Sequence, residues 1–155
     1  MQRAVLEVIV MSMVDVSRKD VVLRTARAEG NLILSSAGVR SLRDGQVKKG
    51  DPLSTATAAA LLAVKGVPHT IPHCHPVPVS SVSVEFDILD RGVHCTCTVS
   101  ALYKTGVEIE ALMGASVALL TIWDMVKYIE KDQSGQYPET SVTDLRVVLK
   151  TKEDV

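Results

Sequence analysis

Two stretches in the middle of the chain alternate strictly between apolar and polar residues, which predicts β-strands. The first covers 81–88 and the second covers 93–101, and Asp90-Arg91-Gly92 supplies a turn between them. The apolar positions of the two stretches are Val82, Val84, Phe86, Ile88, Val93, Cys95, Cys97, Val99 and Ala101. Two runs of period two around a turn predict a β-hairpin with one buried face.

Apolar runs with helical spacing predict three helices. Asp51-Pro52 supplies an N-cap and a proline at the first helical position, and Gly66 follows the last turn, which predicts a helix over 52–65. Thr105 and Glu108 have the spacing of a capping box. They mark the start of the longest predicted helix, over about 107–130. A shorter helix is expected over 36–44.

The remaining apolar segments have weaker patterns. Together with the segments above they indicate the fold class. Residues 21–34 are expected to supply one or two strands, and 145–149 a further strand. Strands and helices mixed with a hairpin predict an α+β fold, an antiparallel sheet with helices packed on one face. The length of 155 residues suits one domain, and one Trp, three Tyr and one Phe leave a core of aliphatic residues and alanine.

Charge and cysteine content exclude several classes of protein. A net charge of -1 argues against a general nucleic-acid binder, and scarce aromatic residues leave little for stacking on bases. Three cysteines do not make a disulfide framework, so we expect a reducing compartment, the cytoplasm. Glu7 interrupts the first apolar run, so no signal peptide is expected, and no uncharged apolar stretch is as long as a membrane span.

The segment Ile71–Pro76 places His73, Cys74 and His75 between two prolines. With Cys95 and Cys97 it suggests zinc, but structural zinc ligands usually come in pairs separated by roughly two to four residues, and only Cys74 separates the two histidines. Both of these other cysteines also fall on the buried face of a predicted strand, where small cysteines commonly pack. We favour a rigid loop that presents His75 to a ligand or a proton, with structural zinc as the alternative.

Three further polar clusters have both a structural and a functional interpretation. Lys48–Asp51 lies at a helix start that could hold phosphate, although a solvated loop with a helix cap is the simpler explanation. Glu108 and Glu110 could serve only as a capping residue and a carboxylate favoured by the helix dipole. Asp124 and Lys127 share a helix face and form either a surface ion pair or a partly buried acid–base pair.

The length of the last predicted helix bears on how many chains make one site. Glu110 and Asp124 are 14 residues apart on it, which corresponds to about 21 Å. One small substrate could hardly contact both ends. If both ends are functional, either the chain carries two sites or a second subunit completes one, and we favour the second.

Five segments together carry a family resemblance: Met13–Ser17, Lys49–Asp51, Ile71–Pro76, Thr105–Leu112 and Leu120–Lys127. In order and spacing they resemble the MoaC family of molybdenum-cofactor biosynthesis, the cyclic pyranopterin monophosphate synthases. The resemblance extends from about Met13 to Lys131. It implies a ferredoxin-like α+β fold and a homohexamer, a trimer of dimers. It also implies a single catalytic domain over 13–155, after an N-terminal extension, 1–12, of unknown role.

The resemblance implies a lyase with a GTP-derived substrate. The family converts 3′,8-cyclo-7,8-dihydro-GTP, the product of a partner radical enzyme, into cyclic pyranopterin monophosphate and releases pyrophosphate. No cofactor is required, although Mg²⁺ could accompany the substrate phosphates, and neither nucleic acid nor a membrane is an expected partner. On this interpretation Lys49, Lys65 and the helix start at Asp51 hold the triphosphate, and Glu108 or Glu110 bonds the polar edges of the base.

The resemblance also assigns roles to single residues. The catalytic aspartate corresponds to Asp124 and the catalytic lysines to Lys49 and Lys127, and no residue is assigned to a metal. The substrate-binding positions are His73, Cys74, His75, Glu108, Ile109, Glu110, Lys65 and Arg24. His73 departs from the leucine of many members. The C-terminus also lacks the Lys-Gly-Gly-Lys-Ser-Gly-like tail of many bacterial members, so either Lys150 or Lys152 could supply its lysine.

Overall fold

The computed structural model describes residues 11–155. The extension predicted over 1–12 therefore lies almost wholly outside the described residues. The first apolar run, which Glu7 interrupts, also lies outside them. The elements are β1 (Val22–Ile33), α1 (Ser36–Arg43), α2 (Pro52–Lys65), α3 (Val67–Thr70), β2 (Ser81–Leu89), β3 (Gly92–Tyr103), α4 (Glu108–Glu130) and β4 (Ser141–Glu153).

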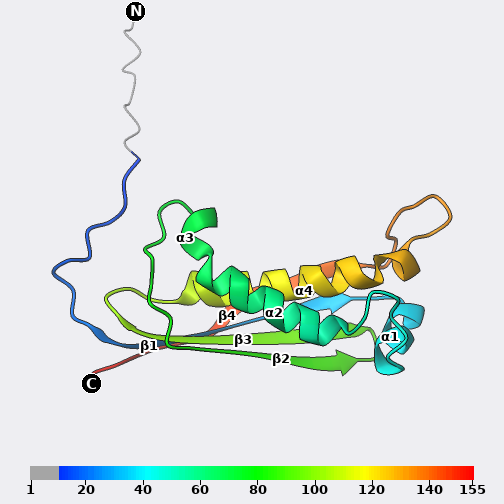
Figure 1. The fold of residues 1–155 in the computed structure, drawn as a ribbon, viewed down its shortest axis with the longest axis horizontal. Helices are drawn as coiled ribbons and strands as arrows, with labels where there is room; N and C mark the ends of the chain where they lie inside the picture. The colour runs from blue at the N-terminus through cyan, green and yellow to red at the C-terminus, as the bar shows by residue number, and fades with distance from the viewer. Residues whose placement is uncertain (1–10) are drawn as a thin grey trace, which may run out of the picture.

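The four strands form one antiparallel sheet in the order β2-β3-β1-β4. With α1 to α3 as one crossover and α4 as the other, the chain follows the β-α-β-β-α-β arrangement of ferredoxin-like folds. The two long helices, α2 and α4, cover the same face of the sheet (Figure 1). The predicted fold class, an antiparallel sheet with helices on one face, is confirmed.

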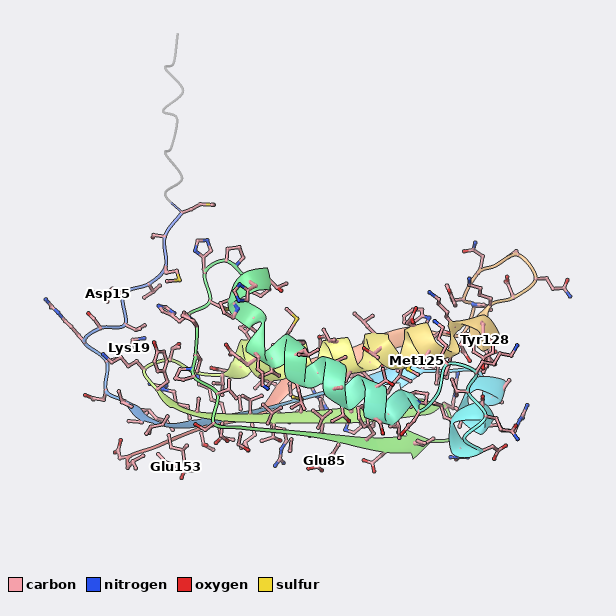
Figure 2. All side chains as sticks on the ribbon, in the orientation of Figure 1. Asp15, Lys19, Glu85, Met125, Tyr128 and Glu153 are labelled. Atoms are coloured by element: carbon pink, nitrogen blue, oxygen red, sulfur yellow. The ribbon has the colours of Figure 1, made fainter. Side chains whose placement is uncertain are left out.

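The predicted hairpin is β2 and β3, and its apolar face packs against the helices. Val93, Cys95 and Cys97 of β3 are buried, and the apolar residues of β2 lie against the same core. Glu85 lies on the opposite side of the sheet, away from the helices (Figure 2). Residues 21–34 supply one strand, β1, which pairs with β3 on one side and β4 on the other.

Small residues let α2, α4 and the sheet approach closely. The buried residues of the two helices include Ala56, Ala60, Ala111, Gly114, Ala115 and Ala118. A Cβ added at Gly114 would lie 2.6 Å from Sγ of Cys97 and 2.9 Å from Cγ2 of Val64, so no larger residue fits there without displacing a neighbour. The sequence has few aromatic residues, and the core is accordingly packed from small ones.

Helix α4 is long and apolar enough to cross a membrane by length and composition, and it is the only described helix that meets this test. Half of its most apolar stretch is buried inside the fold. Its apolar residues contact α2 and the sheet, which is where a core helix of a compact domain needs them.

The two predicted helix starts have different outcomes. Asp51 caps α2 as expected, because its carboxylate accepts the N–H groups of Leu53 at 3.0 Å and Ser54 at 3.4 Å. The capping box of Thr105 and Glu108 is wrong: α4 begins at Glu108, and its N-cap position, Val107, makes no side-chain cap. The carboxylate of Glu108 instead folds over Gly106 and bonds Lys150, so it is not free to cap the backbone at Thr105.

Candidate active site

The three predicted catalytic residues meet at the C-terminal end of α4. Nζ of Lys49 lies 2.8 Å from Oδ2 of Asp124, and Nζ of Lys127 lies 2.7 Å from its Oδ1. Lys49 also donates to the main-chain carbonyl of Asp124 at 2.9 Å. Asp124 and Lys127 are three residues apart on one helix face, whereas Lys49 arrives from the loop between α1 and α2. The fold therefore joins two separate motifs into one cluster of two ammonium groups around one carboxylate.

Hydrogen bonds, rather than burial, set the charges of this cluster. The side chain of Asp124 is 54% exposed, so of the two alternatives for Asp124 and Lys127 the structure shows the surface ion pair. Hydrogen bonds from Lys127 and then Lys49 lower the pKa of Asp124 to about 2, and Asp124 in turn raises the pKa of Lys127. At neutral pH the Asp124 carboxylate is therefore ionised and the Lys127 amine is protonated.

The predicted phosphate-binding position at the start of α2 is occupied by the side chain of Asp51. The N–H groups of Leu53 and Ser54 are bonded to the Asp51 carboxylate, whose pKa is lowered first by the Ser54 hydroxyl and then by the backbone. A negative cap at this position leaves those two donors unavailable to a phosphate. Lys49 and Lys65 are also separated by the whole of α2, so they do not form a single phosphate-binding position within one chain.

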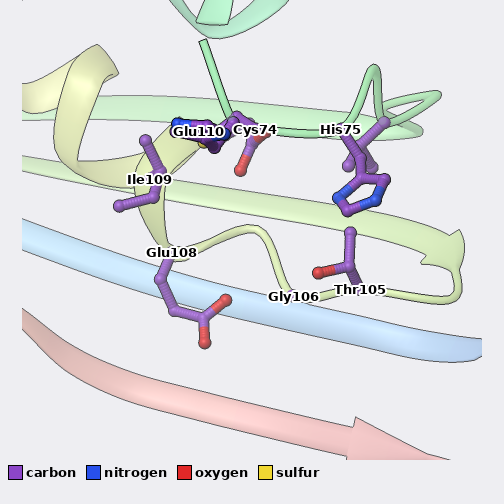
Figure 3. A pocket seen from close by; sticks show the side chains of 9 residues that line it. Cys74, His75, Thr105, Gly106, Glu108, Ile109 and Glu110 are labelled. Carbon is purple, nitrogen blue, oxygen red and sulfur yellow. The ribbon is translucent and has the colours of Figure 1, made fainter. Parts of the chain in front are cut away.

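A cavity of about 270 Å³ lies at the other end of α4. The loop that follows α3 and the turn between β3 and α4 form its walls. Figure 3 shows Glu110 lying against Cys74, and His75 facing Thr105. The lining residues are His73, Cys74, His75, Val77, Thr105, Gly106, Glu108, Ile109 and Glu110, which include six of the eight residues predicted to bind substrate.

Burial governs the ionisable groups at the centre of this cavity. Glu110 is only 4% exposed, and burial raises its pKa, helped by the neighbouring charge of Glu108. Burial also raises the pKa of the Cys74 thiol, and the charge of Glu110 adds to that effect. A half-buried thiol and a carboxyl group that resists ionisation line a pocket suited to hydrogen-bonding polar edges of a ligand.

Glu108 points away from the other cavity residues, toward β4 (Figure 3). It forms an ion pair with Lys150. Burial would raise the pKa of Glu108, but the hydrogen bond from Lys150, its own backbone N–H and the charge of Arg24 together lower it. Arg24 itself is held by the carbonyl groups of Tyr103 and Lys104. Between the two candidates for the tail lysine, the structure brings Lys150 into contact with a predicted site residue.

The segment Met13–Ser17, which the sequence singled out without a role, lies beside the cavity. Nε2 of His75 donates to the carbonyl oxygen of Val14 at 2.7 Å, and Nζ of Lys104 donates to the carbonyl oxygen of Ser17 at 2.7 Å. A second hollow between this segment and the loop shares His73, His75 and Thr105 with the first. Sequence reasoning missed Lys104 because its ammonium bonds a backbone group 87 residues away.

The described residues do not support the alternative of a structural zinc site. Among residues 11–155, no three His, Cys, Asp or Glu side chains are close enough to share a metal ion. Cys95 and Cys97 are buried in the core, and burial raises the pKa of their thiols to about 12 and about 11. Thiols that resist ionisation in this way are poor zinc ligands, because zinc binds the thiolate.

Most of the predicted site residues therefore lie in two groups at opposite ends of α4, and comparison with known proteins shows the family of the chain. The MoaC family model matches residues 13–153, nearly the whole described chain. The chain belongs to the MoaC family. A relative from Pyrococcus abyssi, named probable cyclic pyranopterin monophosphate synthase, is 50% identical over 142 residues, which cover 92% of this chain and 89% of the relative.

Two further relatives of this MoaC chain are similarly close. A protein from Thermococcus kodakarensis with the same name is 51% identical, over 92% of this chain and 91% of the relative. A protein from Methanothermobacter thermautotrophicus, named probable cyclic pyranopterin monophosphate synthase accessory protein, is 51% identical, over 90% of this chain and 88% of the relative. The resemblance found from the five sequence segments is confirmed.

Proposed function

We propose that this MoaC-family chain is a cyclic pyranopterin monophosphate synthase of molybdenum-cofactor biosynthesis. It is a lyase that converts 3′,8-cyclo-7,8-dihydro-GTP into cyclic pyranopterin monophosphate and releases pyrophosphate. The observation that carries the proposal is the cluster of Lys49, Asp124 and Lys127, intact in a chain about 50% identical to proteins named as probable synthases. Asp124 and the two lysines are proposed as the catalytic residues.

The electrostatics of the cluster support a role in moving protons. With two ammonium groups on it, Asp124 is a weak base, since its pKa is about 2. A substrate oxygen that draws one lysine away removes a hydrogen bond from the carboxylate and raises its pKa, so that Asp124 becomes a better proton acceptor. The displaced lysine meanwhile places a positive charge on the substrate.

Pyrophosphate release follows from the same groups. A ribose-derived hydroxyl attacks the α-phosphorus, a new P–O bond forms, and the bond to the β-phosphate oxygen breaks. The hydroxyl proton passes to a base of the site, and the pyrophosphate leaves with the electron pair of the broken bond. Ammonium groups near the leaving oxygens stabilise the charge that develops there.

The second group would bind the rest of the substrate. We propose that His73, Cys74, His75, Glu108, Ile109 and Glu110 hold the pterin-like base, with Arg24 and Lys65 as further contacts near this end. The cavity volume, about 270 Å³, is slightly below the range of roughly 300–1,000 Å³ typical of small-molecule sites. A pocket of this size, open on one side, fits part of a nucleoside triphosphate.

We propose that a second subunit completes the site, within a hexamer built as a trimer of dimers. Glu110 and Asp124 lie about 21 Å apart along α4, which is too far for one small substrate. The edge strand β4 exposes Leu145, Val147, Val148 and Leu149, and an apolar unpaired edge is a natural surface for association. These features support joining the cavity of one chain to the Lys49–Asp124–Lys127 cluster of another.

We propose that no cofactor is needed, although Mg²⁺ could accompany the substrate phosphates, because two lysines already supply positive charge at the catalytic cluster. The cytoplasm is the proposed location, and the three free cysteines, two of them buried, support it. The catalytic domain over 13–155 stays a prediction.

Turnover of the cyclised GTP precursor tests the proposed function. The wild-type protein should release one pyrophosphate for each cyclic pyranopterin monophosphate formed. Lys49→Ala should lower kcat by about 100-fold or more, the usual cost of removing one group that stabilises charge in a transition state. Lys131→Ala, which removes an exposed lysine just beyond α4, is the matched control. Absence of product from folded wild-type protein would contradict the proposal.

A further inference from the structure

Lys49 occupies one of the two central positions of a tight turn, so the geometry of that turn decides where its ammonium lies. The turn runs over Val47–Gly50 and is closed by the N–H of Gly50, which donates to the carbonyl of Val47 at 3.1 Å. Gly50 has a φ of 104°, a conformation that favours glycine. Val47 is buried in the core, whereas Lys48 and Lys49 are exposed. The turn is thus anchored at its first residue and open to solvent at its centre.

Tyr128 holds the exposed part of the turn against α4. The backbone N–H of Lys48 donates to the phenol oxygen of Tyr128 at 2.9 Å. The ammonium of Lys48 also lies 5.1 Å from the centre of the Tyr128 ring, within the range of a cation–π contact. Figure 2 places Tyr128 near the C-terminal end of α4, on the side of α1.

Two consecutive residues of the turn contact two residues on the same face of α4. Tyr128 follows Asp124 by four residues, so the two side chains share one helix face. Lys48 and Lys49 are consecutive in the turn, and they bond Tyr128 and Asp124 respectively. One neutral hydrogen bond therefore fixes the residue immediately before the lysine that bonds the catalytic carboxylate.

We propose that Tyr128 is a positioning residue: its hydroxyl fixes the Val47–Gly50 turn on α4 so that the Lys49 ammonium stays on Asp124. This inference rests on the proposed function for its kinetic consequence, but its structural consequence concerns the substrate-free protein alone. The side chain of Tyr128 bonds Lys48, and no hydrogen bond joins it to Lys49, Asp124 or Lys127. Without the hydroxyl, the centre of the turn keeps only the contact of Lys48 with the ring and the long side chain of Lys49, whose freedom opposes a fixed geometry.

Tyr128→Phe tests the proposal because it removes one oxygen and keeps the ring. We expect kcat to fall about fivefold, which corresponds to ~1 kcal/mol, while KM stays within about twofold. The matched control is Ser116→Ala, which removes from α4 a hydroxyl whose only hydrogen bond within residues 11–155 is to the carbonyl of Leu112 in the same helix. The control should keep the wild-type kcat and KM.

A second measurement separates positioning from a general loss of stability. The side-chain carboxyl carbon of Asp124 is followed by NMR as the substrate-free protein is titrated toward acid. In wild type the pKa is about 2, and in Tyr128→Phe it should rise toward the ordinary aspartate value, because Lys49 spends less time on the carboxylate. Ser116→Ala should titrate as wild type does.

The outcomes distinguish this inference from the proposed function. Wild-type protein that does not turn over the precursor would contradict the function, and the Asp124 titration would still decide the role of Tyr128. A Tyr128→Phe protein with wild-type titration of Asp124 overturns the positioning role, whatever its activity. A raised Asp124 pKa with unchanged kcat would support the placement of Lys49 by Tyr128 and would overturn its expected effect on the reaction.

Discussion

Two carboxylates on α4, Asp124 and Glu110, have pKa values displaced in opposite directions by their surroundings. Asp124 is exposed and bonded by two ammonium groups, so its pKa falls to about 2. Glu110 is buried beside Cys74, and desolvation is the largest influence on it, so its pKa rises. Carboxyl groups with separated pKa values suit separate roles: a charged partner of lysines at one end, and a group that resists ionisation in a pocket at the other.

Replacement of Glu110 by glutamine should stabilise the fold at neutral pH while it impairs substrate binding. The folded protein binds the Glu110 proton more tightly than the unfolded chain, so wild-type stability declines as pH rises through the folded-state pKa. Glutamine carries no such charge. Glu110→Gln should therefore melt about 2–4 °C higher at pH 7, and the difference should shrink as the pH falls and wild type becomes protonated. Melting temperatures from pH 4 to 8 measure this, and a lower Tm at every pH would contradict it.

At the scale of elements, Glu130 joins three parts of the chain at one buried point. It is the last residue of α4 and only 5% exposed. Its carboxylate accepts the N–H of Ser35 at 2.9 Å, the hydroxyl of Ser35 at 2.8 Å and the hydroxyl of Thr140 at 2.6 Å. Ser35 caps α1, and Thr140 precedes β4 directly. Gly38 leaves the room that the carboxylate occupies.

Glu130→Ala should lower the free energy of unfolding by ~2–4 kcal/mol, because buried donors on α1 and before β4 lose their acceptor. Chemical denaturation measures the loss. Glu139→Ala is the matched control: Glu139 is exposed in the loop before β4, and its side chain makes no hydrogen bond or ion pair with any residue of 11–155. Equal stability of the two variants would show that the Glu130 contacts contribute nothing to holding these elements together.

At the scale of the whole molecule, one chain places its two groups of site residues at opposite ends of its longest helix. Lys49, Asp124 and Lys127 already contact one another within a chain, so no second subunit is needed to assemble them. What a single chain does not provide is proximity between this cluster and the cavity around Glu110. A shared site would therefore pair one end of a chain with the other end of its neighbour.

Mixing inactive variants tests this pairing. Asp124→Asn and Glu110→Gln chains, exchanged in equal amounts, should recover about one quarter of wild-type sites, since a mixed dimer has one intact site and one doubly altered site. Asp124→Asn mixed with Lys49→Ala should recover none, because both changes affect the same end of the chain. Subunit exchange is confirmed by mass spectrometry. Equal recovery in the two mixtures, or none in the first, would contradict a shared site.

The sequence by itself determined most of the local structure, because the signals for it are carried by neighbouring residues. Asp51 and Pro52 specify the start of α2 through one cap and one fixed φ, and strict alternation specifies the buried face of β3. The family resemblance likewise depends on short segments. The capping box at Thr105 failed because Glu108 has a stronger partner, Lys150, that is distant in sequence.

Only the tertiary structure decided which distant residues meet. Lys49 reaches Asp124 across 75 residues, and no local pattern marks Tyr128 as the residue that holds the turn beside it. The choice of Lys150 depends on the register of β4 against β1, where Lys150 pairs with buried Ala26 on the helix side of the sheet. Local preferences act over a few residues, whereas such contacts depend on how sheet and helices pack, and the relative placement of the two halves of the site is fixed by the length of α4.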